Sequence, residues 1–187
     1  MGVPDLEDCQ RQFQQIGEGV GALAEGLTEA QFTWRPRQEV WSIQECFGHL
    51  TIVGQQYLRL IENAIQQARV RRITGTPPFH YGWLERSFLR QNEPPVRRRV
   101  PAPRRFRPVH GQPVTAILPT LLHVQREFIR LAELAKGLDL VRVKVRSPIS
   151  RFIRFSLGIT LAQQAAHERR HLEQARRVRE NPAFLAK

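Results

Sequence analysis

The stretch from Ser156 to Gln174, SLGITLAQQAAHERRHLEQ, constrains the fold of this chain more than any other segment. Its composition favours a helix, and Asn181-Pro182 gives a stop signal beyond it. At about 100° per residue, one face is apolar at both ends and polar in the middle: Ile149, Ile153, Ser156, Thr160, Gln163, Gln164, His167, His171, Gln174 and Val178. The apolar ends predict that this face points into a helical bundle, where its amides and imidazoles need partners. An exposed polar face without a function is the alternative interpretation.

His167 and His171 are four residues apart, so their imidazoles lie one turn apart on one side of a helix and can bind the same metal ion. The segment also fits H-E-x-x-H, the zinc-protease pattern in which Glu168 would be the general base. The extended protease motif fails, because Gln174 and Arg177 occupy the places of its glycine and third histidine. Glu168 lies about 100° around the helix from His167, so we expect it to flank the site or form a surface ion pair. A general-base role for Glu168 is the alternative.

The length of 187 residues predicts a single domain, residues 1–187, and the composition favours an all-α protein. Leu, Ala, Gln, Glu and Arg are abundant, and no long alternating strand pattern occurs. The net charge of +12 raises nucleic acid as a partner, but the arginines are scattered and no recognition helix accompanies them, which disfavours that class. Two cysteines do not make a disulfide framework or a Cys-rich zinc site. With no signal-like N-terminus and no membrane-spanning stretch, we expect a cytoplasmic protein.

Three further helices are predicted from one-face apolar patterns. The first pattern runs from Leu6 to Leu27, and the second helix begins at Ser42, where Glu45 completes a capping box. The third pattern runs from Ile117 to Ala135. Ser147-Pro148 predicts the N-cap and first position of the fourth helix.

A long connection rich in proline and arginine, residues 69–112, joins the second and third helices. Its aromatic residues predict that it packs across the bundle, and its length would permit a crossover that makes these helices parallel. Arg104 and Arg105 within it could bind a carboxylate or phosphate, although we expect surface solvation. On the second helix, His49 lies at the border of the apolar stripe, and Cys46 one turn earlier is expected to be a core cysteine.

Two motifs together resemble a known family. WSIQECFGHL, ending near His49, is similar to the capped second-helix motif of the DinB-like (YfiT-like) metal-binding four-helix bundles, and HERRHLEQ resembles the H-x-x-x-H of their fourth helix. The resemblance covers essentially the whole chain. It implies a four-helix bundle in which His49, His167 and His171 bind a divalent metal. It also implies a link to thiol-dependent S-transferases and an isomerase that use mycothiol or bacillithiol, although many members have no known activity.

Three neutral histidines would leave the metal an open position, as in a catalytic site. We therefore expect an enzyme that uses Zn²⁺ or Ni²⁺ to activate a low-molecular-weight thiol or water on a small-molecule substrate. The function we expect first is an S-transferase-like reaction, and a metal-dependent hydrolase is the second candidate. A non-catalytic stress-response protein that binds a metal or a ligand is an alternative from a different class. Thr160, Gln163 and Gln164 are expected to contact the bound ligand or to satisfy one another. An exposed bundle face could support a homodimer.

Overall fold

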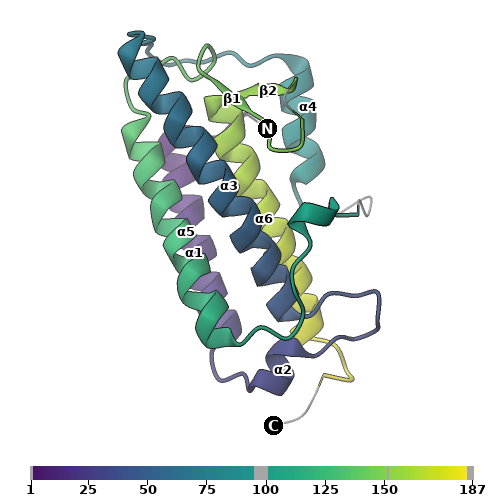
Figure 1. Ribbon diagram of the computed structural model, residues 1–187. Helices are drawn as coiled ribbons and strands as arrows, with labels where there is room; N and C mark the ends of the chain where they lie inside the picture. The colour runs from purple at the N-terminus through teal and green to yellow at the C-terminus, as the bar shows by residue number, and fades with distance from the viewer. Residues whose placement is uncertain (1, 95–100, 151, 185–187) are drawn as a thin grey trace.

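The computed structural model describes residues 2–94, 101–150 and 152–184. Four long helices form a bundle, which confirms the predicted all-α class (Figure 1): α1 Leu6–Ala24, α3 Ile43–Val70, α5 Val114–Leu134 and α6 Leu157–Arg179. Shorter elements lie between them: α2 Glu29–Thr33, α4 Trp83–Asn92, the 3-10 turn η1 Arg104–Phe106, and the strands β1 Lys144–Arg146 and β2 Arg154–Ser156. Within these described ranges, no helix is both long enough and apolar enough to cross a membrane.

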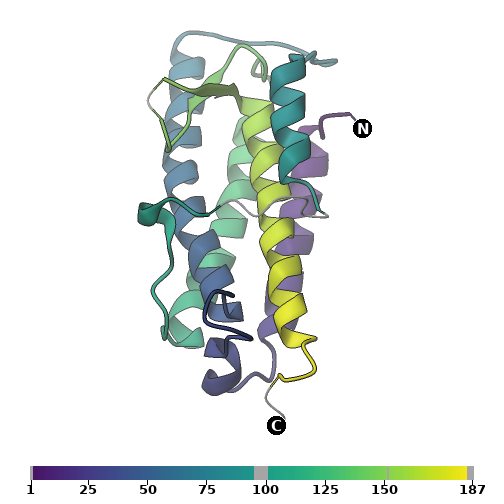
Figure 2. The ribbon, with the colours of Figure 1, turned by 90° about the vertical axis from the view of Figure 1, so that its right-hand side faces the viewer.

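The four long helices pack as a ring in which α1 and α3 each contact both α5 and α6. α3 and α5 run parallel (Figure 1). Two contacts show this: Gly54 faces Val124 near the middle of each helix, and Arg69 donates to the carbonyl of Leu134 near the C-terminal end of each. α6 runs the opposite way beside α3, as both views show (Figure 2). The N-terminal half of α3 therefore lies beside the C-terminal half of α6.

The start of α3 is fixed by the capping box predicted from its sequence. Ser42 Oγ accepts from the backbone N–H of Glu45 at 3.1 Å, and the carboxylate of Glu45 accepts from the N–H of Ser42 at 3.0 Å. Arg35 donates to the same carboxylate from the loop before the helix. This buried network sets where α3 begins, and so where its side chains point.

The core is built from the apolar stripes of the helices, as their spacing predicts. Phe13 of α1 stacks on Phe128 of α5 with ring centroids 4.6 Å apart, and both rings are buried. α3 approaches α5 closely at Gly54, where an added Cβ would lie 2.5 Å from Cγ1 of Val124. Glycine suits this position, because a Cβ there would overlap the side chain of Val124 and one of the two would have to shift.

The predicted start of the last helix is wrong. Ser147-Pro148 does not cap it; α6 begins at Leu157, after an antiparallel hairpin that pairs Lys144 with Ser156. Ile149 and Ile153 lie in the hairpin loop, 61% and 45% exposed, and so do not mark a buried helix face. The hairpin forms here instead of the predicted helical turns. Burial of Val145 and the hydrogen bond from the N–H of Leu157 to the carbonyl of Val143 stabilise it. The predicted face nevertheless turns inward from Ser156 through Gln164.

The long connection covers the outside of the bundle. α4 packs against α6, and η1 then contacts α3. Beyond η1 the chain follows the first turns of α3, where Gln44 exchanges two hydrogen bonds with it: its amide donates to the carbonyl of Val109 at 2.8 Å and its oxygen accepts from the N–H of Gly111 at 2.9 Å. The connection thus reaches the part of α3 that carries His49.

Candidate metal centre

Three histidines converge between α3 and α6. His49 lies on the second turn of α3, and His167 and His171 lie on successive turns of α6. One ring nitrogen from each lies within 4.8 Å of the others, and Nε2 of His49 is 3.3 Å from Nε2 of His167. Among the described residues, this is the one group of three or more His, Cys, Asp or Glu side chains whose ligand atoms converge in this way. The three residues predicted as ligands are therefore brought together.

The orientation of His49 is set by the long connection. Its Nδ1 lies 2.7 Å from the carbonyl oxygen of Phe106 in η1. A carbonyl can only accept, so we assign the proton to Nδ1, which leaves the lone pair of Nε2 directed at His167. A backbone carbonyl that fixes the tautomer of a histidine in this way is a usual feature of metal ligands.

The spacing of the nitrogens fits a divalent ion. Zinc binds imidazole nitrogen at about 2.0–2.1 Å, so two ligands on a tetrahedral ion lie about 3.3–3.4 Å apart. The 3.3 Å between Nε2 of His49 and Nε2 of His167 matches that edge. In most metal sites the second ring nitrogen of each ligand histidine forms a hydrogen bond. Here Nδ1 of His167 and Nδ1 of His171 are buried without a hydrogen-bond partner among the described residues.

Burial holds all three imidazoles in the neutral form that binds metals. Desolvation lowers the pKa of His49, against the opposing bond to Phe106. It lowers the pKa of His167 to about 3, aided by His49 and Arg170. It also takes the pKa of His171 well below its ordinary value, with the other two histidines and Arg170 adding to the effect and Gln174 opposing it. No proton therefore has to leave these rings at neutral pH before a cation binds.

Trp41 covers the cluster, and sequence reasoning did not assign it to the site. Its ring centroid is 5.0 Å from that of His49 and 5.8 Å from that of His171, nearly parallel to the latter. The indole is half-buried, so it forms an apolar wall between the imidazoles and the surface. The only sequence signal was its place just before the cap of α3, which does not reveal a contact with α6.

The polar residues N-terminal to His167 bond mainly within their own helix. Gln164 donates to the side-chain oxygen of Gln163, and Thr160 donates to the carbonyl of Ser156 at 2.9 Å. Mutual satisfaction of the glutamines, one of the two expectations for them, is thus what the geometry shows. The remaining oxygen of Gln164 is buried without a hydrogen-bond partner among the described residues. Contact of these three residues with a ligand stays a prediction.

Glu168 is not on the surface, so the expected surface ion pair is wrong. It is 1% exposed, because it lies on the face of α6 that turns into the bundle, whereas its neighbours Arg169 and Arg170 are only half-buried. Its carboxyl lies beside the side-chain amide of Gln125 of α5, but the two groups do not form a hydrogen bond of normal geometry. Burial raises its pKa to about 8, with Gln125 and Arg169 opposing. The carboxyl turns towards the bundle interior and is not part of the histidine group, so the geometry lends no support to a protease-type base.

Neither cysteine is available for chemistry. Cys9 and Cys46 are both free and buried. Burial raises the pKa of Cys9 to about 12 and also raises the pKa of Cys46, so neither forms a thiolate at neutral pH. Cys46 lies one turn before His49 but does not join the histidine group, as expected of a core cysteine.

Comparison with known proteins places the chain in a family. Residues 12–175 match the family model of the DinB superfamily, a region that includes all three histidines. Neither a search of curated proteins nor a search of solved structures found a match. Because the matched region spans most of the 187 residues, the chain belongs to the DinB superfamily.

Proposed function

We propose that this member of the DinB superfamily binds a divalent metal ion through His49, His167 and His171 and activates a small nucleophile there. One observation carries the proposal: three neutral imidazoles from two helices converge, with two Nε2 atoms at a separation that suits a shared ion. When bound, such an ion supplies Lewis acidity and favours the anionic form of a thiol or of water. Zn²⁺ and Ni²⁺ are the metals we propose, since both accept imidazole.

A low-molecular-weight thiol is the leading nucleophile, as in an S-transferase-like reaction. The buried Cys9 and Cys46 cannot supply a thiolate, so a thiol that reacts at this site has to come from solution. The roles of the chain are then to hold His49 through the carbonyl of Phe106 and to limit access of bulk water through the indole of Trp41. A hydrolase that activates water at the same place is the second candidate.

A non-catalytic role is the other class of function. The chain would then bind a metal or a small ligand without turnover, as a stress-response protein can. A cytoplasmic location, a small-molecule partner and a homodimer belong to the same proposal. Size-exclusion chromatography with light scattering would check the homodimer.

The test of activity compares matched variants after loading with Zn²⁺ or Ni²⁺. The rate of thiol addition to an electrophile, and separately of ester hydrolysis, is measured for the wild type, His167→Ala and the control His123→Ala, an exposed histidine of α5 outside the site. We expect metal-dependent thiol conjugation that His167→Ala abolishes and His123→Ala retains. Metal-dependent hydrolysis alone would favour the hydrolase. Tight metal binding with neither reaction would contradict an enzymatic role and favour the non-catalytic one.

A further inference from the structure

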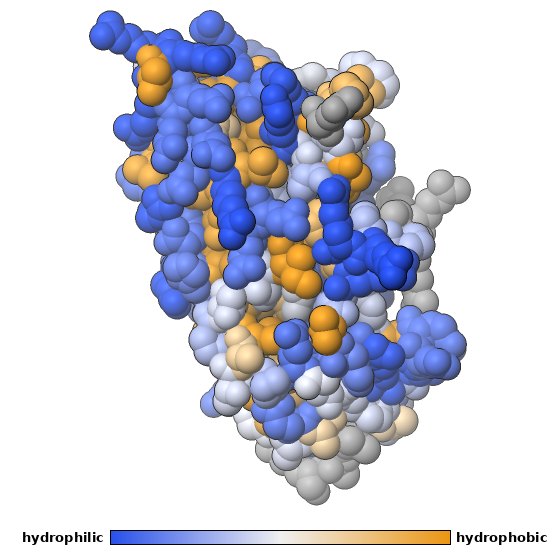
Figure 3. Space-filling model, viewed as in Figure 1, coloured by the Kyte–Doolittle hydropathy of each residue, from blue (hydrophilic) through white to orange (hydrophobic). Residues whose placement is uncertain are grey.

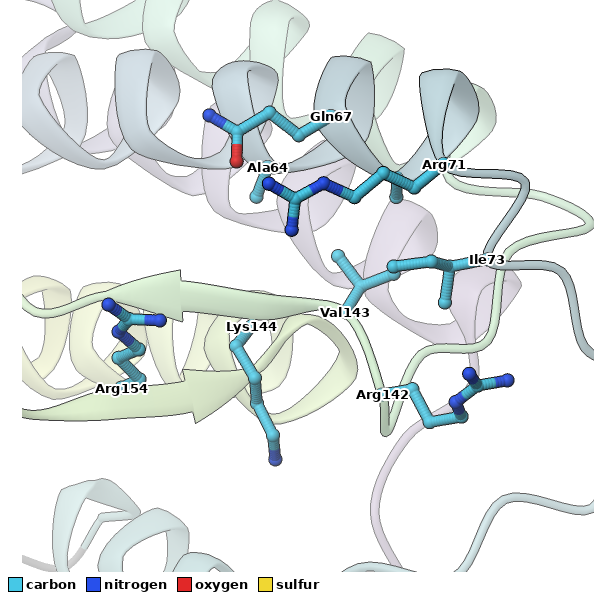
Figure 4. Close-up of a pocket in the computed structure, with 9 residues that line it drawn as sticks. Ala64, Gln67, Arg71, Ile73, Arg142, Val143, Lys144 and Arg154 are labelled. Atoms are coloured by element: carbon cyan, nitrogen blue, oxygen red, sulfur yellow. The ribbon is translucent and has the colours of Figure 1, made fainter.

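A hollow lies far from the histidines, between the C-terminal turns of α3 and the β1–β2 hairpin (Figure 4). Its volume is about 200 Å³, and its floor includes Ala68 and Val143. Gln67 on its wall is eighteen residues along α3 from His49, which corresponds to about 27 Å at 1.5 Å per residue. The hollow is therefore separate from the candidate metal centre.

The lining of this hollow is basic. Four of its nine lining residues are cations, Arg71, Arg142, Lys144 and Arg154, and none is acidic. Lys144 donates to Ser156 Oγ at 2.9 Å and lies 3.5 Å from the carboxylate of Glu85. The three arginines are exposed, and no described residue forms an ion pair with any of them.

Figure 4 shows which of these side chains face the space. The guanidinium of Arg71 extends from the end of α3 below Gln67, and Arg154 points from β2 towards the same gap, whereas Lys144 and Arg142 turn away from it. Arg71 and Arg154 therefore approach the hollow from opposite walls, and the amide of Gln67 lies on the same wall as Arg71. Arg142 and Lys144 add positive charge nearby.

The hairpin itself concentrates like charges. Arg146 and Arg154 are direct partners in the antiparallel register. Like charges placed directly opposite each other destabilise a strand pair, and this pair is only three residues long. Arg71 has a local explanation, since a cation at a helix C-terminus interacts favourably with the helix dipole, but Arg154 opposite Arg146 has none. An anion bound beside Arg154 would offset this repulsion.

We propose that this hollow binds a small multivalent anion of the phosphate class, held between Arg71 and Arg154. Guanidinium groups bind phosphate oxygens through paired hydrogen bonds, and the Gln67 amide can donate a further one. A volume of about 200 Å³ is below the range of pockets for drug-sized ligands, so it suits a phosphate or diphosphate group with the rest of any larger molecule outside. The face of the molecule in Figure 3 is largely hydrophilic, which suits a charged ligand that arrives from water.

Isothermal titration with inorganic pyrophosphate tests the proposal, at about 0.15 M salt so that diffuse charge is screened. The wild type is compared with Arg71→Gln/Arg154→Gln and with the control Arg59→Gln/Arg126→Gln, which removes two exposed arginines elsewhere on α3 and α5. We expect one saturable site in the wild type, affinity at least about tenfold weaker in the hollow pair, and little change in the control pair. Arg71→Lys/Arg154→Lys, which keeps the charge but loses the paired bonds, should be intermediate.

Three results would overturn the proposal. Equal weakening in both glutamine pairs would show that net charge, not the hollow, attracts the anion. Loss of pyrophosphate binding in His167→Ala would place the anion at the histidines instead. If pyrophosphate does not bind but the hollow pair weakens binding of a single-stranded oligonucleotide, the surface is a nucleic-acid contact.

Discussion

Removal of Arg35 should destabilise the start of α3 by an amount that depends on pH. The carboxylate of Glu45 is buried and accepts from Nε of Arg35 at 2.7 Å, from a second guanidinium nitrogen of Arg35, and from the N–H of Ser42. Arg35→Gln leaves this carboxylate buried with only His110 nearby, whose Nδ1 lies 3.6 Å away and which is a cation only when protonated. Loss of one partner of a fully buried ion pair costs about 3–5 kcal/mol. Because the side chain of Arg35 is 31% exposed, we expect a loss of about 2 kcal/mol in the free energy of unfolding at pH 7.

The pH dependence follows from the pKa of Glu45. Burial raises this pKa, but the bonds from Arg35 and Ser42 outweigh burial, and the net pKa lies below the ordinary value of 4.5. A carboxyl with a lowered pKa in the folded state stabilises the protein above pH 4.5 and loses that contribution as pH falls through its folded pKa. The destabilisation caused by Arg35→Gln should therefore shrink in acid.

A double-mutant cycle measures this interaction by urea denaturation. Glu45→Gln is the matched partner, because glutamine at this position can still complete the capping box with Ser42. The coupling free energy between Arg35→Gln and Glu45→Gln should be about 2 kcal/mol at pH 7 and smaller at pH 4. A coupling below about 0.5 kcal/mol at pH 7, as for an exposed ion pair, would refute the reasoning. So would a coupling that is equal at the two pH values.

Three further predictions concern the site, the packing and the thiols. Phe106→Ala should weaken Zn²⁺ affinity by about tenfold or more, because it loosens the η1 turn whose carbonyl orients His49. Competition with a chromogenic chelator measures the affinity, and an unchanged value would contradict this role of the turn. Gly54→Ala should lower stability by about 1 kcal/mol, and Val124→Ala should relieve that loss in the double variant; simple additivity in urea titrations would argue against the close approach. Cys9 and Cys46 should react with a disulfide reagent only as fast as the protein unfolds, whereas rapid reaction in native buffer would show that they are accessible.

Local patterns made much of the fold predictable. The apolar face of α1 and the Ser42–Glu45 capping box of α3 depend only on residues a few positions apart, and both are present in the folded protein. The start of α6 was not predictable in this way. Ser147-Pro148 is a good local cap, but pairing of Lys144 with Ser156 across a hairpin is a non-local contact that a helical wheel does not include.

The candidate site shows the same division. The i, i+4 spacing identified His167 and His171, whereas His49 was singled out by its border position and by a family resemblance. The roles of Trp41 and Phe106 depend on how two loops cross the bundle, so the sequence around them carries no comparable signal. Glu168 was misplaced because the inward face of α6 is wider than the face predicted from Ser156 to Val178, and it also includes the position about 100° around the helix from His167.

Elemental analysis of purified, untagged protein tests the metal centre most directly. The wild type is compared with His49→Ala, with His167→Ala/His171→Ala, and with the exposed control His123→Ala. We predict close to one divalent ion per chain in the wild type and the control, and loss of the ion in both site variants. Absence of metal from the wild type, even after reconstitution, would contradict the account. Retention of the ion in His49→Ala would show that α3 does not supply a ligand.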